Sequence, residues 1–544
     1  MKKDTFIKGA LISTICVVLS KILGIIYVIP FNKIIGSEGG ALYGYAYNIY
    51  VLFLQLSTVG IPLAISKLVS EYNALNYHDA KKRVYKVALI ITSIISIIVT
   101  IILNVFAYDI AYMIKGNVVG GNTLSDIAFV IRVSSSAIFF VTLLSNMRGF
   151  LQGQKYITHS SISQVIEQFV RIIVIVLGSY IFIKLFGVKE AVAVAIFGAT
   201  VGAIAAIIYL LIKGKKELKL KDNDYKIKEE EREITNSYLT KKLIKCTIPF
   251  VMLSIIVSLY NSIDMFTVIK TLVNKASFTV EDAEYIMSCI STWGAKLNMI
   301  VTSISAGIAT SLLPNITDDY TKGNYKAISD KVIKTVSILL VLVIPMVLGL
   351  SFLASPVWTV FYGNNSLGIK VFTYSIFTAL LSGLFTNINV IMQSVNSYRK
   401  AYFSLIVGIM FKIIMNVPFI LLFNNLGLPA YYGNITVTIL SYLISIILNL
   451  ITLKKEFKID FKIILKILLL SVLSGLIMYA CLYGLSYLIP ITNLSKLKCI
   501  MVIIIYSVVG GIIYLSLMLN SKTIKNNFHD EIKIIKQKKF SKFK

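Results

Sequence analysis

Several charged side chains lie inside long apolar stretches of this 544-residue chain, where charge is energetically expensive. Lys21, Lys296 and Lys412 each lie near the middle of such a stretch. If these stretches cross a bilayer, each lysine costs on the order of 3 kcal/mol and needs a partner, a wet cavity or a ligand. Ammonium groups bind phosphate well as point charges. We therefore expect lysines that share a cavity to bind a phosphorylated, anionic substrate.

An acid and a base occur together in one of the apolar stretches. Glu167 precedes Arg171 by four residues, so their side chains lie on the same face if the stretch is helical. They can contact the substrate together with the lysines, or they can form a structural ion pair between helices. The spacing of the two residues supports both interpretations.

A second carboxylate lies further along the chain. Asp264 follows the polar residues Asn261 and Ser262, and Lys270 lies beyond it in the same apolar stretch. Asp264 could bind a coupling cation or a proton, or it could pair with a lysine and hold one conformation. Asp264 and Lys270 are therefore candidates for a coupling or conformational role.

The composition indicates what surrounds these side chains. Hydrophobic residues make up 57% of the chain and charged residues 15%, and the mean hydropathy is +0.80. These values exclude a water-soluble protein. A helix of about 20 apolar residues crosses a ~30 Å hydrocarbon layer, and the chain has roughly fourteen such stretches. We predict an all-α polytopic membrane protein with about 14 transmembrane helices.

The predicted spans form two sets of six and a final pair. The first set lies at about 7–31, 41–69, 85–107, 125–148, 160–184 and 189–212. The second lies at about 246–270, 284–313, 332–354, 367–393, 401–423 and 429–452, and the pair at about 463–487 and 498–519. The predicted domains are an N-lobe at 1–212, a linker at 213–245, a C-lobe at 246–453, a helix pair at 454–519 and a basic tail at 520–544.

The net charge of +28 is spread over the predicted loops and the tail. No part of the chain gathers it into a module that reads nucleic acid, so we expect no nucleic-acid partner. Lysine and arginine accumulate on the cytoplasmic loops of membrane proteins. This bias predicts a cytoplasmic linker and two cytoplasmic termini. The tail would lie on anionic headgroups or be solvated.

The cysteines and histidines show no spacing typical of a metal or redox site. We expect neither a metal nor a cofactor. Asp222 and Asp224 fit a D-x-D pattern, which in a membrane glycosyltransferase could hold a divalent metal. A solvated charge run explains these two residues better, because lysines and glutamates surround them. We therefore do not expect an enzyme.

Several short motifs resemble a known family of membrane transporters. They are SKILG at 20–24, ALYG at 41–44, ISKLVSEYNAL at 65–75, RGFLQG at 148–153, QVIEQ at 164–168 and LLP at 312–314. These motifs resemble the polysaccharide exporters of the MOP superfamily, in particular the YtgP/SpoVB group with its MurJ-like lipid II flippases. The resemblance covers nearly the whole chain.

The resemblance implies a V-shaped pair of six-helix lobes, a central cationic cavity and a groove for a lipid tail formed by two further helices. Lys21 and Lys296 match basic residues of the family that would contact a diphosphate. Tyr27 stands where the better-known MurJ branch has a second arginine in its first helix, so the grip on phosphate differs in detail.

The resemblance also suggests the function. A flippase would move lipid II, an undecaprenyl-diphosphate-linked peptidoglycan precursor, across the bacterial cytoplasmic membrane by alternating access. Its partners would be this substrate and membrane lipids, with a coupling cation or the membrane potential as a driving force. The alternatives are export of another lipid-linked oligosaccharide, such as teichoic acid or capsule, and cation-coupled drug efflux. Drug efflux would favour an acidic pocket, whereas the central residues here are largely basic.

Overall fold

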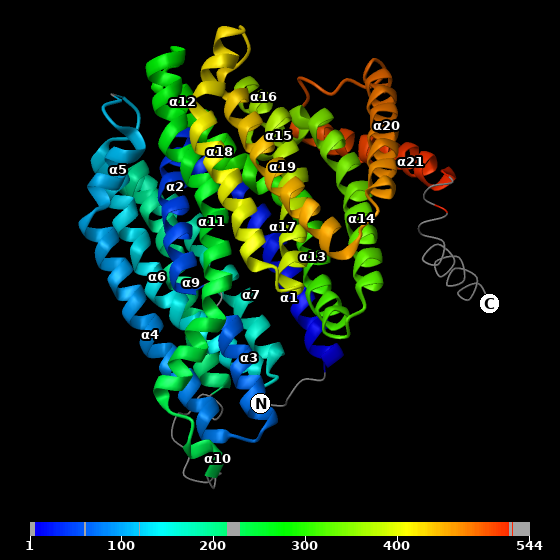
Figure 1. The fold of residues 1–544 in the computed structure, drawn as a ribbon. Coiled ribbons are helices and arrows are strands. Elements are labelled where there is room, and N and C mark those ends of the chain that lie inside the picture. The colour runs from blue at the N-terminus through cyan, green and yellow to red at the C-terminus, as the bar shows by residue number, and fades with distance from the viewer. Residues whose placement is uncertain (1–5, 59–60, 119, 215–228, 522–524, 526–544) are drawn as a thin grey trace, which may run out of the picture. The chain divides into compact units, whose positions relative to one another are not determined.

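The computed structural model describes residues 6–58, 61–118, 120–214, 229–521 and 525 (Figure 1). The described residues form helices and loops without a strand. Among them, 10 helices are long and apolar enough to cross a membrane, or 11 if the bent pair Leu19–Ile26 and Val28–Leu54 counts as one span. The predicted all-α polytopic membrane fold is therefore confirmed.

The chain divides into two compact units, Met1–Trp293 and Gly294–Lys544. The helices of the first unit are α1 (Phe6–Ile26), α2 (Val28–Thr58), α3 (Ile61–Ala74), α4 (His78–Val105), α5 (Ala107–Lys115), α6 (Leu124–Gly153), α7 (Ile157–Ile173), the π-helix η1 (Val174–Gly178), α8 (Ser179–Leu185), α9 (Val188–Lys213), α10 (Glu229–Arg232), α11 (Asn236–Ala276), α12 (Val280–Ser288) and the π-helix η2 (Cys289–Trp293). The helices of the second unit are α13 (Gly294–Thr321), α14 (Tyr325–Phe352), α15 (Ala354–Tyr362), α16 (Ser366–Ser375), α17 (Phe377–Ser394), α18 (Tyr398–Asn425), α19 (Ala430–Phe457), α20 (Phe461–Ser486) and α21 (Lys496–Asn520).

Helix α6 organises the first unit, where it packs against α2, α3, α4 and α9. Glycines allow the closest approach: a Cβ atom on Gly149 would lie 2.7 Å from the carbonyl oxygen of Pro62, and one on Gly153 would lie 2.7 Å from that of Ser66. Small residues are common between membrane helices because close packing replaces the hydrophobic effect as the cause of their association. These contacts hold α3 against the end of α6 that carries Arg148.

Buried amides join the helices of the second unit. Asn434 on α19 donates to the side-chain oxygen of Asn416 on α18 (2.9 Å), and Asn449 on α19 donates to that of Asn389 on α17 (3.3 Å). Asn387 donates to the carbonyl oxygen of Ser305 on α13 (3.0 Å). Hydrogen bonds of this kind are a usual role of polar residues inside membranes.

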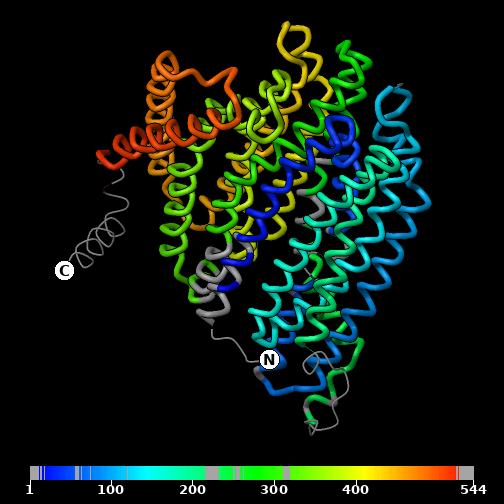
Figure 2. Tube along the Cα trace, turned by 180° about the vertical axis from the view of Figure 1, so that it is seen from behind, coloured from blue at the N-terminus to red at the C-terminus, as the bar shows by residue number. Residues whose placement is uncertain are grey.

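The last two helices lie against α14. Helix α20 packs along α14, where a Cβ atom on Gly475 would lie 2.5 Å from a methyl carbon of Leu348. Helix α21 runs across α20 instead of parallel to it, as both views show (Figures 1 and 2). The hydroxyl of Tyr514 on α21 donates to the carbonyl oxygen of Val341 on α14 (2.9 Å), which ties this crossing helix to the rest of the unit.

The boundary between the two compact units lies after Trp293 and not at the polar segment 213–245. Helix α11 follows that segment but packs against α2, α3, α4 and α5, so it belongs to the first unit. The predicted six-helix lobes stay a prediction. Asp222 and Asp224, and the basic tail apart from residues 520, 521 and 525, lie outside the described residues.

Candidate site around the buried charges

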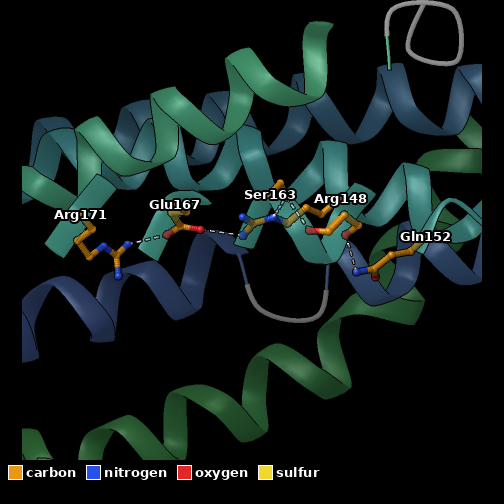
Figure 3. A network of polar contacts seen from close by, with 6 residues as sticks. Arg148, Gln152, Ser163, Glu167 and Arg171 are labelled. Atoms are coloured by element: carbon orange, nitrogen blue, oxygen red, sulfur yellow. Dashed lines mark hydrogen bonds and ion pairs between the residues drawn. The ribbon is translucent and has the colours of Figure 1, made fainter. Parts of the chain in front are cut away.

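Glu167 lies between two arginines inside the first unit (Figure 3). Arg171 Nη2 lies 2.7 Å from Glu167 Oε1, and Arg148 Nη1 lies 2.8 Å from Glu167 Oε2. The side chains of Arg148, Glu167 and Arg171 are 16%, 12% and 21% exposed. The ion pair suggested by the i, i+4 spacing thus exists, and it has a second arginine as a partner. Two guanidinium groups against one carboxylate leave the cluster with a net positive charge.

Hydroxyl groups extend this network toward the end of α6. Arg148 Nε donates to Ser163 Oγ (2.8 Å), whose hydroxyl donates to the carbonyl oxygen of Ser160 (2.6 Å). Gln152 donates to the hydroxyl oxygen of Ser160 (2.9 Å) (Figure 3). Arg148 Nη2 and Arg171 Nε are buried without a hydrogen-bond partner among the described residues. An unpaired buried donor is costly, so these two groups favour an anion or water beside them.

The packing of α9 against α7 positions the acid and the second arginine. A Cβ atom on Gly202 would lie 2.6 Å from the carbonyl oxygen of Glu167, and one on Gly198 would lie 3.1 Å from that of Arg171. The π-helix η1 begins three residues after Arg171. Such interruptions are frequent at functional sites. The backbone around the ionic cluster is therefore both tightly packed and locally irregular.

Lys21 lies on α1, which packs directly against α7. A Cβ atom on Gly24, one turn after Lys21, would lie 3.5 Å from the side-chain nitrogen of Gln168. Lys21 is half-buried, and it has no hydrogen bond or ion pair within the part of the chain that the structure describes. Its ammonium group is thus available to a ligand on the helix next to the Arg148–Glu167–Arg171 cluster.

The other two lysines belong to the second unit. Lys296 is half-buried near the start of α13. Lys412 is 0% exposed on α18, one turn before Asn416, whose side chain takes part in the amide contact with α19. The structure therefore brings Glu167, Arg171 and Arg148 together, places Lys21 on the adjoining helix, and encloses Lys412 within a helix interface.

Asp264 and Lys270 occupy different surroundings on α11. Asp264 is 5% exposed, whereas Lys270 is partly exposed and donates a hydrogen bond to the carbonyl oxygen of Met113 on α5. Six residues on a helix correspond to about 600°, so the two side chains leave α11 in different directions. Lys270 thus connects α11 to α5.

Arg148 is the member of the cluster that the sequence did not indicate. It lies 19 residues before Glu167 and on another helix, so no helical spacing relates the two residues. In the sequence it stands out only as the first residue of the RGFLQG motif, at the end of a predicted span. The available signal was the neighbouring Gly149, since a glycine in a span often marks a close helix contact.

The described helices are those of an integral membrane protein, and solved structures show the same fold. A structure of the lipid II flippase MurJ in an inward closed conformation matches with a TM-score of 0.66 and 15% identity, covering 96% of this chain and 100% of that one. An inward-facing multidrug resistance MATE family transporter of the MOP superfamily matches with a TM-score of 0.62 and 14% identity, covering 82% of this chain and 99% of that one.

The sequence comparisons show the family. The model for polysaccharide biosynthesis proteins matches residues 6–319. A Bacillus subtilis (strain 168) protein described as lipid II flippase MurJ is 31% identical over 525 residues, covering 94% of each chain. The chain belongs to the polysaccharide biosynthesis protein family, and the MOP-type resemblance noted from its motifs is confirmed.

Proposed function

We propose that this protein is a flippase for a lipid-linked diphosphate saccharide, with lipid II as its cargo. It would move the cargo from the cytoplasmic to the outer leaflet of a bacterial cytoplasmic membrane by alternating access. The observation that carries this proposal is the buried cluster of Arg148, Glu167 and Arg171, with its net positive charge and two donors that have no partner among the described residues. Lys21, which has no partner within the described part of the chain either, lies on the adjoining helix α1. A diphosphate supplies the negative charge and the acceptors that such a site lacks.

The proposed roles follow the surroundings of each residue. Lys21 is the proposed diphosphate contact of the first unit. Lys296 is a separate candidate contact in the second unit. Arg171 adds positive charge and one spare donor, while Glu167 holds the two guanidinium groups in place. Lys412 is fully enclosed, so it would reach substrate only if α18 and α19 separated, and we assign it a structural role.

A groove in the second unit suits the lipid part of the cargo. A cavity of about 340 Å³ lies between α14, α20 and α21, with α13 at one edge. Nearly all of its lining is apolar, including Leu342, Met346, Met478 and Ile503. Because lipid tails are as apolar as this lining, van der Waals packing rather than the hydrophobic effect would hold a prenyl chain there. The chain could therefore stay in lipid and in this groove while the headgroup crosses.

The solved structures cover different percentages of this chain, and this difference also supports a lipid-linked cargo. The MurJ structure matches 96% of the chain, whereas the MATE transporter matches 82%. The difference is similar in size to the part of the chain from α20 onward, which supplies two walls of the groove. A multidrug exporter would have no need of such a groove, whereas a prenyl-linked cargo would.

The driving force belongs to the proposal as well. The buried Asp264 could bind a coupling cation or a proton. The membrane potential could act directly, because one elementary charge moved across 100 mV corresponds to about 2.3 kcal/mol.

The test is lipid II translocation by the purified protein in vesicles. We expect Lys21→Gln and Lys296→Gln each to lower the rate about tenfold or more, because each removes a hydrogen bond to a charged group worth about 1.5–3 kcal/mol. Lys326→Gln, an exposed lysine at the start of α14, is the matched control and should transport normally.

Two results would contradict the proposal. If both lysine variants translocate lipid II at the parent rate, the site is wrong. If the parent protein moves another lipid-linked oligosaccharide but not lipid II, and does not restore growth to a strain depleted of its lipid II flippase, the cargo is wrong.

A further inference from the structure

The first unit contains an apolar pocket that the proposed transport site does not use. It has a volume of about 210 Å³ and lies between α4 and α11, with α3 at one end. Ile91 and Ile95 of α4 line one wall, and Thr247, Ile248 and Met252 of α11 line the other. The pocket is open on one side and its lining is almost entirely apolar, so an apolar occupant suits it better than water does.

One polar group in this pocket has no partner. Thr247 is 9% exposed, and its hydroxyl makes no hydrogen bond with any residue that the structure describes. A threonine in a helix usually donates to the carbonyl four residues earlier, as Thr92 across the pocket does to Ala88 (2.8 Å). The hydroxyl of Thr247 is therefore available to an acceptor carried by the occupant.

Two unpaired lysines continue the pocket toward the start of α11. Lys241 and Lys245 are exposed and have no hydrogen bond or ion pair within the described ranges. Residues 241, 245, 248 and 252 follow one another at helical spacing, so these lysines share a stripe with Ile248 and Met252. Met252 follows Lys245 by seven positions, which is about 10 Å along the helix. The site thus has a cationic end and an apolar end.

A third lysine at this end of α11 already has partners within the protein. Lys242 lies 2.6 Å from Glu71 and 5.1 Å from the ring centre of Tyr72, both on α3. It ties α11 to α3. The positive charge of Lys241 and Lys245, in contrast, has no partner of this kind among the residues that the structure describes.

The surroundings point to a lipid as the occupant. The outer face of α4 beside the pocket exposes Ile90, Ile94, Ile97 and Ile98, so acyl chains surround this helix. A soluble anion would need the lysines but not the pocket, and a zwitterionic lipid would need the pocket but has no net charge for two lysines.

We propose that this pocket binds one anionic glycerophospholipid. Its phosphate contacts Lys241 and Lys245, one acyl chain enters the pocket beside Ile95 and Ile248, and an ester carbonyl accepts from the hydroxyl of Thr247. The bound chain joins α11 to α3 and α4, so the lipid stabilises the first unit. This site is separate from the buried arginines and does not depend on the identity of the transported cargo.

The experiment measures thermal unfolding of the purified full chain in detergent during titration with lipid. Phosphatidylglycerol and phosphatidylcholine with identical acyl chains are compared, together with glycerophosphoglycerol, which has the headgroup but no chains. We expect phosphatidylglycerol to raise Tm saturably, and the other two compounds to raise it far less.

Paired variants test each end of the site. Lys241→Gln/Lys245→Gln should weaken the apparent affinity for phosphatidylglycerol roughly 30-fold, the value for two lysines near an anionic lipid surface. Lys275→Gln, exposed at the other end of α11, should leave that affinity unchanged. Ile95→Phe should fill the pocket and abolish the Tm rise, whereas Ile97→Phe on the outer face of α4 should not.

Three outcomes would overturn the proposal. Equal stabilisation by phosphatidylglycerol and phosphatidylcholine would exclude a role for the lysines. An effect of glycerophosphoglycerol equal to that of the full lipid would reduce the site to a simple anion contact. Unchanged affinity in the double lysine variant, which changes only exposed side chains, would remove the headgroup site altogether.

Discussion

In the Arg148–Glu167–Arg171 cluster, one carboxylate faces two guanidinium groups. Removing the glutamate should therefore destabilise the protein more than removing one arginine. Glu167→Gln leaves two guanidinium groups without a counter-charge. Removing one partner of a buried pair costs about 3–5 kcal/mol, and the partial exposure of these side chains places the expected loss near 3 kcal/mol. Arg171→Gln leaves Glu167 paired with Arg148, so only one charged hydrogen bond is lost, at about 1.5 kcal/mol.

Thermal unfolding in detergent measures this difference. Glu167→Gln should lower Tm about twice as much as Arg171→Gln, and Asp330→Asn, an exposed acid on α14, serves as the control with little change. The double variant Glu167→Gln/Arg171→Gln should be more stable than Glu167→Gln alone, because it removes one of the two uncompensated charges. Equal losses in the two single variants, or a double variant that is less stable than Glu167→Gln, would refute the assignment of Glu167 as the shared counter-charge.

Three further predictions concern other parts of the fold. Gly202→Ala should destabilise the protein by about 1–3 kcal/mol, because its Cβ atom would meet the backbone of α7, whereas Gly484→Ala, with no atom within 4 Å, should be neutral or stabilising in the same unfolding assay. Asn416→Leu should cost about 1–3 kcal/mol by removing the side-chain oxygen that accepts a hydrogen bond from the buried amide of Asn434, and Asn416→Leu/Asn434→Leu should recover part of that loss; unfolding of the two variants side by side checks this. Ser507→Trp should fill the groove between α14 and α21 and slow lipid II translocation several-fold without lowering Tm; an unchanged rate would argue against the groove as the path of the prenyl chain.

Hydropathy predicted the helical membrane fold because each span must satisfy its own backbone hydrogen bonds in lipid. The same physics explains why the spacing of Glu167 and Arg171 was informative: neighbours on one helix face follow from the helical repeat alone. Arg148 could not be paired with Glu167 in this way, because that contact depends on how α6 and α7 pack and on the glycines between neighbouring helices.

Two side chains at a similar depth in the bilayer can differ in their access to a cavity. Lys21 and Lys412 looked equivalent in the sequence, since both interrupt apolar stretches near their middle. The structure leaves Lys21 half-buried, with no hydrogen bond or ion pair to any residue it describes, and encloses Lys412 completely within its helix interface. The rotation of a helix about its own axis determines which of these two surroundings a side chain has. In a helix that is apolar on all sides, the sequence pattern gives little indication of that rotation.

The π-helix after Arg171 sets the helical phase of everything that follows it. One additional residue per turn advances the later side chains by about 100°, and in this phase Ser179 is fully buried and donates to the carbonyl oxygen of Ala191 on α9 (3.0 Å). Deleting a single residue within Val174–Gly178 would restore an ordinary α-helix and turn Ser179 away from α9. Glu167 and Arg171, which precede the deletion, would keep their orientation, so the length of this short segment alone determines how the second half of the span docks.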